Sequence, residues 1–131
     1  MIRKPLSRKA KSAPRRGMMD AQDRLWFGLY RGNKIAMFDT KEEKFKEWEM
    51  PMPFSAPYDV TIDKTGQVWT GSMLDDRVSR LDPNTGTIVE YLLPRETNIR
   101  RVDVDKSVTP SQLWIGSNHG AALIRVEPLE P

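Results

Sequence analysis

The stretch GQVWTGSMLDDRVSRLDPNTGTIVEYLLP, residues 66–94, decides the fold, because short runs of apolar and β-branched residues alternate in it with strong turn signals. Apolar positions recur every second residue, which favours strands over helices. Asp-Pro-Asn-Thr-Gly at 82–86 is a turn in which the proline presets φ and the glycine supplies positive φ. With the preceding segment, the pattern predicts four antiparallel strands, at 58–62, 67–71, 78–81 and 87–92.

The same block occurs three times in the 131 residues. Trp26, Trp69 and Trp114 each open a copy, at spacings of 43 and 45 residues. Each copy has a glycine two residues after the tryptophan: Gly28, Gly71 and Gly116. Each has an acid thirteen residues after it: Asp39, Asp82 and Glu127. Each also has an aspartate before it: Asp20, Asp63 and Asp105. A repeat of four short strands with a period of about 40–45 residues is typical of β-propeller blades.

The sequence therefore predicts an all-β fold: a partial β-propeller of about three four-stranded antiparallel blades, at 12–53, 54–95 and 96–131, the last lacking its outer strand. The repeated tryptophans are expected to pack between blades, whereas Trp48 stands outside their period and is expected at the surface. Propellers typically have about 4–8 blades, so three cannot close a ring. Open edges predict self-association, a requirement for further blades of a longer propeller, or marginal stability.

Charge is concentrated at the start of the chain. The net charge is +3, from 21 basic and 18 acidic residues, and residues 1–11 hold five of the basic ones and no acid. This segment is expected to be a disordered solvated tail; the alternative is a contact with nucleic acid or anionic lipid. The rest of the chain has no interleaved basic and aromatic surface, so nucleic acid is not the expected partner.

Composition excludes several classes of site. There is no cysteine, which excludes disulfides and thiolate chemistry, and a single histidine excludes a multi-histidine metal site. No apolar run approaches the roughly 20 residues of a membrane span. No secretory signal is recognisable, so the cytoplasm is the default location, and the periplasm stays open for a longer parent protein.

The motifs at 66–69, 76–78, 81–86 and 90–94 resemble the blade signature of the streptogramin lyases, also called virginiamycin B lyases. Residues 55–59, 98–101 and 116–120 resemble the C-terminal blades of a bacterial lyase-like branch. The resemblance implies a seven-bladed propeller. It also implies antibiotic inactivation, in which cyclic depsipeptides are opened by β-elimination. That reaction requires a base and an electrophile, and Mg²⁺ is the electrophile.

The family's catalytic pattern is not matched in these blades. The resemblance implies a histidine base at the entry to an inner strand, where this chain has Arg15, Tyr58 and Arg100. It also implies an acid in the position that follows the tryptophan by three residues, where this chain has Leu29, Ser72 and Ser117.

Antiparallel strands place the entry of each first strand and the loop between the second and third strands on one face of the predicted propeller. Loops held by a rigid scaffold favour functional residues. Arginine forks bind carboxylates and phosphates bidentately, so a small anionic molecule or a cyclic peptide is the expected ligand. The alternative is that the arginines pair with acids between blades. The residues expected on this face are Arg15, Arg16, Tyr58, Asp59, Arg100 and Arg101 from strand entries, and Tyr30, Arg31, Asp75, Asp76, Asn118 and His119 from loops.

Three functions follow from this face. The first is ligand binding by the arginines together with Tyr58, Asp59 and Asn118. The second is lyase activity, with His119 as base and Mg²⁺ held by Asp75 and Asp76; the alternatives are a turn-fixing histidine and a solvated acidic loop. The third is a non-catalytic scaffold or protein-interaction surface.

Overall fold

The computed structural model describes residues 12–129, which form eleven β-strands. Within these residues no helix is long and apolar enough to cross a membrane. The strands are β1 Pro14–Met19, β2 Arg24–Leu29, β3 Lys34–Asp39, β4 Lys44–Glu49, β5 Pro57–Ile62, β6 Val68–Ser72, β7 Arg77–Leu81, β8 Ile88–Leu92, β9 Ile99–Asp105, β10 Gln112–Ser117 and β11 Ala122–Val126.

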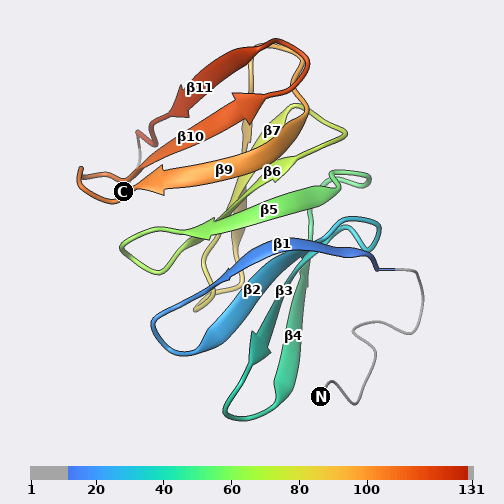
Figure 1. Ribbon diagram of the computed structural model, residues 1–131, viewed down its shortest axis with the longest axis vertical. Coiled ribbons are helices and arrows are strands. Elements are labelled where there is room, and N and C mark those ends of the chain that lie inside the picture. Colours follow the sequence, from blue (N-terminus) through green and yellow to red (C-terminus); the bar gives the residue numbers. More distant parts are fainter. Residues whose placement is uncertain (1–11, 130–131) are drawn as a thin grey trace.

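The strands form three antiparallel sheets in chain order, β1-β2-β3-β4, β5-β6-β7-β8 and β9-β10-β11 (Figure 1). This confirms the predicted all-β fold, the four strands of the first two blades and the missing outer strand of the third. In the clearest copy the strand bounds differ from the prediction by one residue: 67–71 was expected where β6 is Val68–Ser72.

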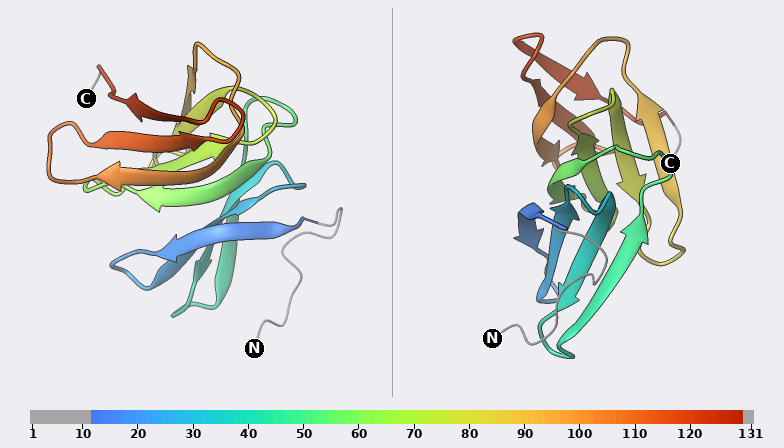
Figure 2. Two further views of the ribbon diagram at one scale, coloured as in Figure 1. Left: turned by 45° about the horizontal axis from the view of Figure 1, so that its top comes forward. Right: turned by 90° about the vertical axis from the view of Figure 1, so that its right-hand side faces the viewer.

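The first strands of the three sheets, β1, β5 and β9, lie side by side, and each sheet extends away from them (Figures 1 and 2). Each of these inner strands pairs only with the second strand of its own sheet among the described residues. The sheets are therefore consecutive blades, and their inner strands together form one surface.

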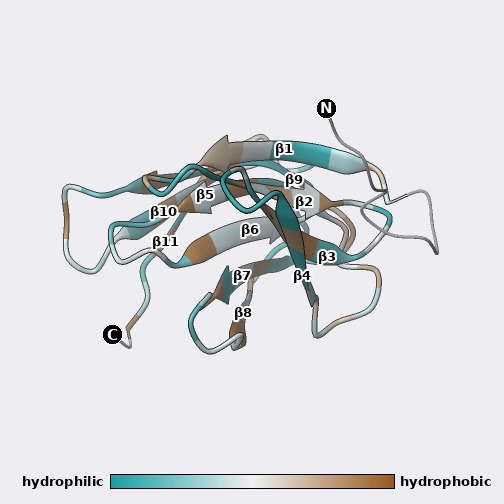
Figure 3. Cartoon of the chain, turned by 90° about the horizontal axis from the view of Figure 1, so that it is seen from below, coloured by the Kyte–Doolittle hydropathy of each residue, from teal (hydrophilic) through white to brown (hydrophobic). Residues whose placement is uncertain are grey.

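Two apolar cores hold the blades together. In the first, Trp26 and Ile35 of blade one pack against Val60, Val68 and other residues of blade two. In the second, blade two and blade three meet in the same way around Trp69. Both tryptophans are 1% exposed, which confirms their predicted place between blades. Trp114 is 40% exposed, because no described sheet covers its side of blade three. Figure 3 shows apolar stretches (brown) on β5, β6 and β8 and a hydrophilic stretch (teal) on β1.

The expectation for Trp48 was wrong. This residue is half-buried and its ring is stacked on Trp26, with the ring centroids 5.2 Å apart. Tyr91 is stacked on Trp69 in the same way at 5.7 Å. Since Trp48 and Tyr91 stand 43 residues apart, they occupy one repeat position. Trp48 belongs to the period of the fourth strand, not to that of the second.

The repeated glycine explains how closely the blades approach. A Cβ on Gly28 would lie 2.6 Å from the Pro57 carbonyl oxygen, and one on Gly71 would lie 2.2 Å from Ile99 Cγ2. Both positions therefore require glycine, because the inner strand of the next blade fills the space. At Gly116 nothing lies within 4 Å of the corresponding point.

Candidate ligand-binding surface

Backbone hydrogen bonds bring each strand entry next to the loop of its own blade, as the topology predicted. Tyr30 N donates to Ala13 O at 3.2 Å, and Met73 N donates to Ala56 O at 3.3 Å. Asn118 makes the corresponding bond in blade three (Asn118 N to Asn98 O, 3.3 Å). Ala13 and Ala56, in the two Ser-Ala-Pro motifs, have φ of 49° and 54°. This left-handed backbone, which disfavours bulky side chains, bends the chain into the inner strand.

A concavity of about 380 Å³ lies across the three inner strands. Arg16 of β1, Asp59 of β5 and Arg101 of β9 stand at the same position of their strands and all line it. Both arginines are exposed, whereas Asp59 is only 7% exposed. The other lining residues are Gly17, Met18, Val60, Thr61, Val102 and Asp103.

The Asp59 carboxylate has two partners from blade three. Its Oδ2 accepts a hydrogen bond from Val102 N at 3.1 Å and lies 3.9 Å from Arg101 Nε. Its Oδ1 accepts from Val60 N at 3.1 Å. Asp59 therefore joins β5 to β9 beneath the concavity. Arg101 has a side chain 66% exposed, so this long ion pair leaves most of its guanidinium facing solvent.

The other arginines of the predicted set have different surroundings. The Arg15 guanidinium lies over the rings of Tyr30 and Tyr58, at 5.3 and 5.7 Å from their centroids. Those two rings meet edge to face at 6.3 Å across the boundary between blades one and two. These three side chains form a cation–π cluster, and none of them is among the residues that line the concavity.

Arg100 and Asn118 converge on one side chain of blade three. Arg100 Nε donates to Asn98 Oδ1 at 3.0 Å, and Asn118 Nδ2 approaches the same oxygen at 3.4 Å. Among the predicted ligand-binding residues, the structure thus gathers Arg16, Asp59 and Arg101 in the concavity. Arg15 and Tyr58 lie together at one blade boundary, and Arg100 and Asn118 lie at the entry of β9.

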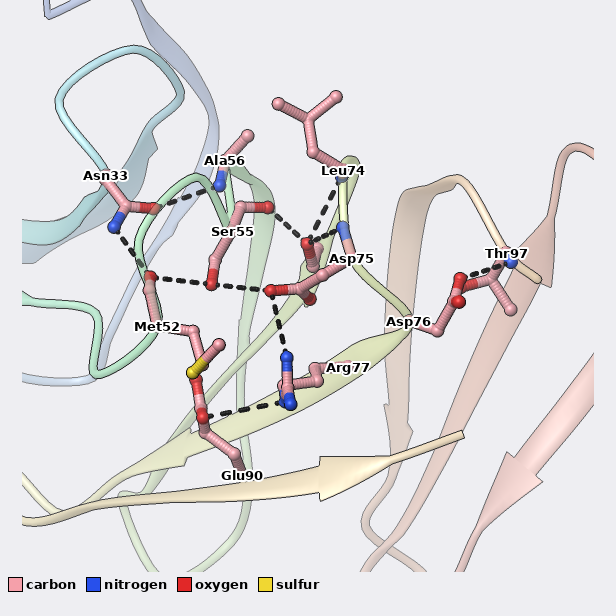
Figure 4. Close-up of polar contacts among 11 residues, drawn as sticks. Asn33, Met52, Ser55, Ala56, Leu74, Asp75, Asp76, Arg77, Glu90 and Thr97 are labelled. Atoms are coloured by element: carbon pink, nitrogen blue, oxygen red, sulfur yellow. Dashed lines mark hydrogen bonds and ion pairs between the residues drawn. The ribbon is translucent and has the colours of Figure 1, made fainter. Parts of the chain in front are cut away.

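Asp75 and Asp76 are adjacent in sequence but make contacts with different elements (Figure 4). Asp75 Oδ2 accepts from Ser55 Oγ at 2.9 Å and lies 3.5 Å from Arg77 NH1. Asp76 Oδ1 accepts from Thr97 N at 2.7 Å and from Thr97 Oγ1 at 3.2 Å. Within residues 12–129 no group of three or more acids, histidines or cysteines is placed to hold a metal ion. The two carboxylates are thus held by different partners, and their role as magnesium ligands stays a prediction.

Asp76 has a structural function that the sequence analysis missed. Its repeat equivalent is Asn33, whose Oδ1 accepts from Ala56 N at 3.1 Å (Figure 4). Each of these side chains thus reaches from the loop of one blade to the entry of the next blade. We call this contact the loop clasp. The spacing of 43 residues between Asn33 and Asp76 was the signal in the sequence that could have revealed it.

Near this loop, the carboxyl of Glu90 has a pKa that is shifted chiefly by burial. Burial raises the pKa of the Glu90 carboxyl; Arg77, whose Nε lies 3.8 Å from Oε2, lowers it, and Asp75 adds to the increase. One oxygen of Glu90 and one of Asp75 are buried without a hydrogen bond. Two acids share one guanidinium here, which makes this a structural cluster and not an anion-binding site.

His119 lies in the turn between β10 and β11 and is exposed. It is not among the residues that line the concavity. The predicted base therefore follows Asn118 on the entry side of blade three and is not part of the concavity that Arg16 and Arg101 line.

The fold defined by these blades is that of a β-propeller segment. No family model and no curated protein matches this chain. Several solved structures are similar to it. A catalytically inactive virginiamycin B lyase from Staphylococcus aureus with quinupristin aligns over 95% of this chain, with a TM-score of 0.76 and 22% identity. A streptogramin B lyase structure aligns over 95% with a TM-score of 0.69 and 16% identity. YCF48 bound to D1 peptide aligns over 92% with a TM-score of 0.68 and 14% identity.

These likenesses establish the fold and agree with the predicted resemblance at that level. The chain spans less than half of each of these proteins, at 44%, 44% and 38% of their lengths.

Proposed function

We propose that this chain binds a small anionic molecule in the inner-strand concavity. The observation that carries the proposal is the placement of two exposed guanidiniums, Arg16 and Arg101, at equivalent positions of β1 and β9 on either side of β5. A ligand bearing a carboxylate or phosphate would accept two hydrogen bonds from each fork.

Asp59 supports this function indirectly. Its carboxylate is buried, accepts a hydrogen bond from Val102 N, and lies 3.9 Å from Arg101 Nε. Asp59 therefore orients that arginine without covering it. Its negative charge also limits the net charge of the surface, which favours a ligand with a hydroxyl or amine beside its anionic group.

The experiment is a calorimetric titration of the whole chain with inorganic phosphate and with citrate. Replacing Arg16 and Arg101 with Ala is expected to weaken binding by at least about tenfold per arginine, since the loss of even one charge-assisted hydrogen bond costs about 1.5–3 kcal/mol. Arg95→Ala, at an exposed position of the connector between β8 and β9, is the matched control. Absence of binding to both anions, or equal affinity in the Arg101→Ala variant, would contradict the proposal.

The likeness to a lyase with quinupristin favours a second candidate, β-elimination on a cyclic depsipeptide. In this chain His119 would be the base, taking a proton from the carbon next to the one that bears the ester oxygen. A C=C bond would form there as the alkyl C–O bond of the ester breaks, and the freed carboxylate would be the leaving group that opens the ring. Its exposed turn lies apart from the concavity, so the substrate would have to bind across the entry side of blade three. Incubation with quinupristin, followed by mass spectrometry for the opened ring, distinguishes this candidate. Turnover that persists in His119→Ala would eliminate His119 as the base.

The third candidate is a non-catalytic surface for proteins. One similar structure is described as bound to a peptide, which supports it. Binding of neither anion, with no turnover of quinupristin, would favour this function.

A further inference from the structure

The two ends of the blade series are both apolar, although nothing covers them among residues 12–129. At one end, the side of blade three that carries Trp114 also carries Leu123, which is 78% exposed. At the other end, the side of blade one that faces away from blade two carries Leu25, Phe27, Phe38 and Phe45. A sheet face that meets water is normally polar, so apolar residues on both outer faces indicate that each is covered by another sheet.

The outer face of blade three repeats the face that blade two buries. Trp114 is paired across β10 and β11 with Arg125, just as Trp69 is paired across β6 and β7 with Arg80. We call this the tryptophan face. Gly116 completes the likeness, because its Cβ position is open where the same position on Gly71 is filled by β9.

The outer face of blade one is the counterpart. Leu25, Phe38 and Phe45 occupy the repeat positions of Val68, Leu81 and Ile88, and these three residues of blade two form the core around Trp26. In blade one the corresponding side chains border an apolar groove of about 200 Å³ that Pro14 and Phe27 also line. We call this the receiving face. The Phe38 and Phe45 rings are 4.6 Å apart and form its wall.

We propose that two copies of this chain associate head to tail, with Trp114 of one copy in the receiving face of the other. The contact would reproduce the two packed blade boundaries already present in the chain, including the close approach of an inner strand to a glycine. β1 of the second copy would lie over Gly116. Such a contact joins different surfaces and closes only if the rotation completes a ring. Two copies would supply six blades, within the usual range of about 4–8.

The test is the molar mass of the full chain by sedimentation equilibrium over a range of concentrations. The wild-type chain is expected to be a dimer. Trp114→Glu and Leu25→Glu each place a charge on one of the two faces, at side chains 40% and 36% exposed, and each is expected to be a monomer. Leu74→Glu, at a 61% exposed loop position of blade two, is the matched control and is expected to remain a dimer.

Mixing the two monomeric variants gives the sharpest result. The Trp114→Glu chain keeps an intact receiving face and the Leu25→Glu chain keeps an intact tryptophan face, so an equimolar mixture is expected to form a one-to-one heterodimer. Circular dichroism of each variant verifies that it is folded. A wild-type monomer at every concentration would overturn the proposal in favour of a preceding blade as the covering sheet. Folded variants that stay dimeric, or a mixture that stays monomeric, would also overturn it.

Discussion

The indole Nε1 of Trp69 donates a hydrogen bond to Oδ2 of Asp63 at 2.9 Å. The other oxygen of that carboxylate accepts from Thr65 N at 2.9 Å and from Gln67 N at 3.1 Å. One buried aspartate therefore fixes both the turn between β5 and β6 and the orientation of the ring that packs between blades. Asp20 and Trp26 repeat the contact in blade one at 2.8 Å.

Replacing Asp63 with Ala is expected to reduce the free energy of unfolding by about 2 kcal/mol, because the indole donor and two turn amides lose their acceptor. Urea denaturation measures the change. Asp105→Ala is the matched control, since Asp105 accepts local bonds from Ser107 N and Oγ at 2.8 and 2.6 Å and no hydrogen bond from Trp114 is seen among residues 12–129. Equal losses in the two variants would show that the indole bond contributes nothing.

A methyl group at Gly71 is expected to destabilise the fold by about 1–3 kcal/mol, because it would overlap Ile99. Gly116→Ala has open space at the same repeat position within one chain. In the Trp114→Glu background, which is expected to be monomeric, it is therefore expected to leave the stability almost unchanged. Thermal unfolding followed by circular dichroism compares the two variants. If Gly71→Ala unfolds at the wild-type temperature, the close approach of β9 to β6 is wrong.

Trp48→Ala is expected to cost about 2 kcal/mol of unfolding free energy, because it removes a large half-buried ring stacked on Trp26. Trp48→Tyr introduces the residue type that stands at the equivalent position of blade two, Tyr91. This variant is expected to keep most of the unfolding free energy that Trp48→Ala loses. Chemical denaturation of both variants provides the measurement. A surface tryptophan, as the sequence analysis expected, would give no loss in either.

Glu90 gives the stability a specific dependence on pH. Its pKa is raised above the ordinary 4.5, chiefly by burial. The folded state therefore holds this proton more tightly than the unfolded chain does. The resulting stabilisation is present below pH 4.5 and is lost as the pH rises through the folded-state pKa.

Glu90→Gln removes this titration and keeps a hydrogen-bonding side chain beside Arg77. The free energy of unfolding of the variant, relative to wild type, is therefore expected to increase as the pH is raised from below 4.5 towards neutrality. Urea denaturation at a series of pH values tests this, with the exposed Glu96→Gln as control. A difference that is constant with pH would contradict the raised pKa.

The fold could be predicted from the sequence because its determinants are local and repeated. Alternating apolar residues, Asp-Pro-Asn-Thr-Gly and the tryptophan period each recur at fixed spacing. The prediction for Trp48 was wrong because its equivalent in blade two is an aromatic residue of another type, Tyr91, so the repeat of a stacked ring does not appear as a repeat of tryptophan.

The candidate site could be predicted only in part. Strand entries and loops were placed on one face from topology alone, and that face is present. The separation of the arginines into concavity, tyrosine cluster and β9 entry depends on which way each side chain leaves its strand. The loop clasp of Asp76 was missed because its partner, Thr97, belongs to the next blade, and a pair of adjacent acids by itself indicates only negative charge.

The loop clasp has a direction: Asn33 holds the entry of blade two, and Asp76 holds the entry of blade three. A blade emerging during synthesis therefore has a polar side chain whose acceptor is filled only when the following inner strand arrives. Each sheet thus completes its polar contacts only with the entry of its successor, so a chain cut after any one blade would leave an unsatisfied acceptor at the cut.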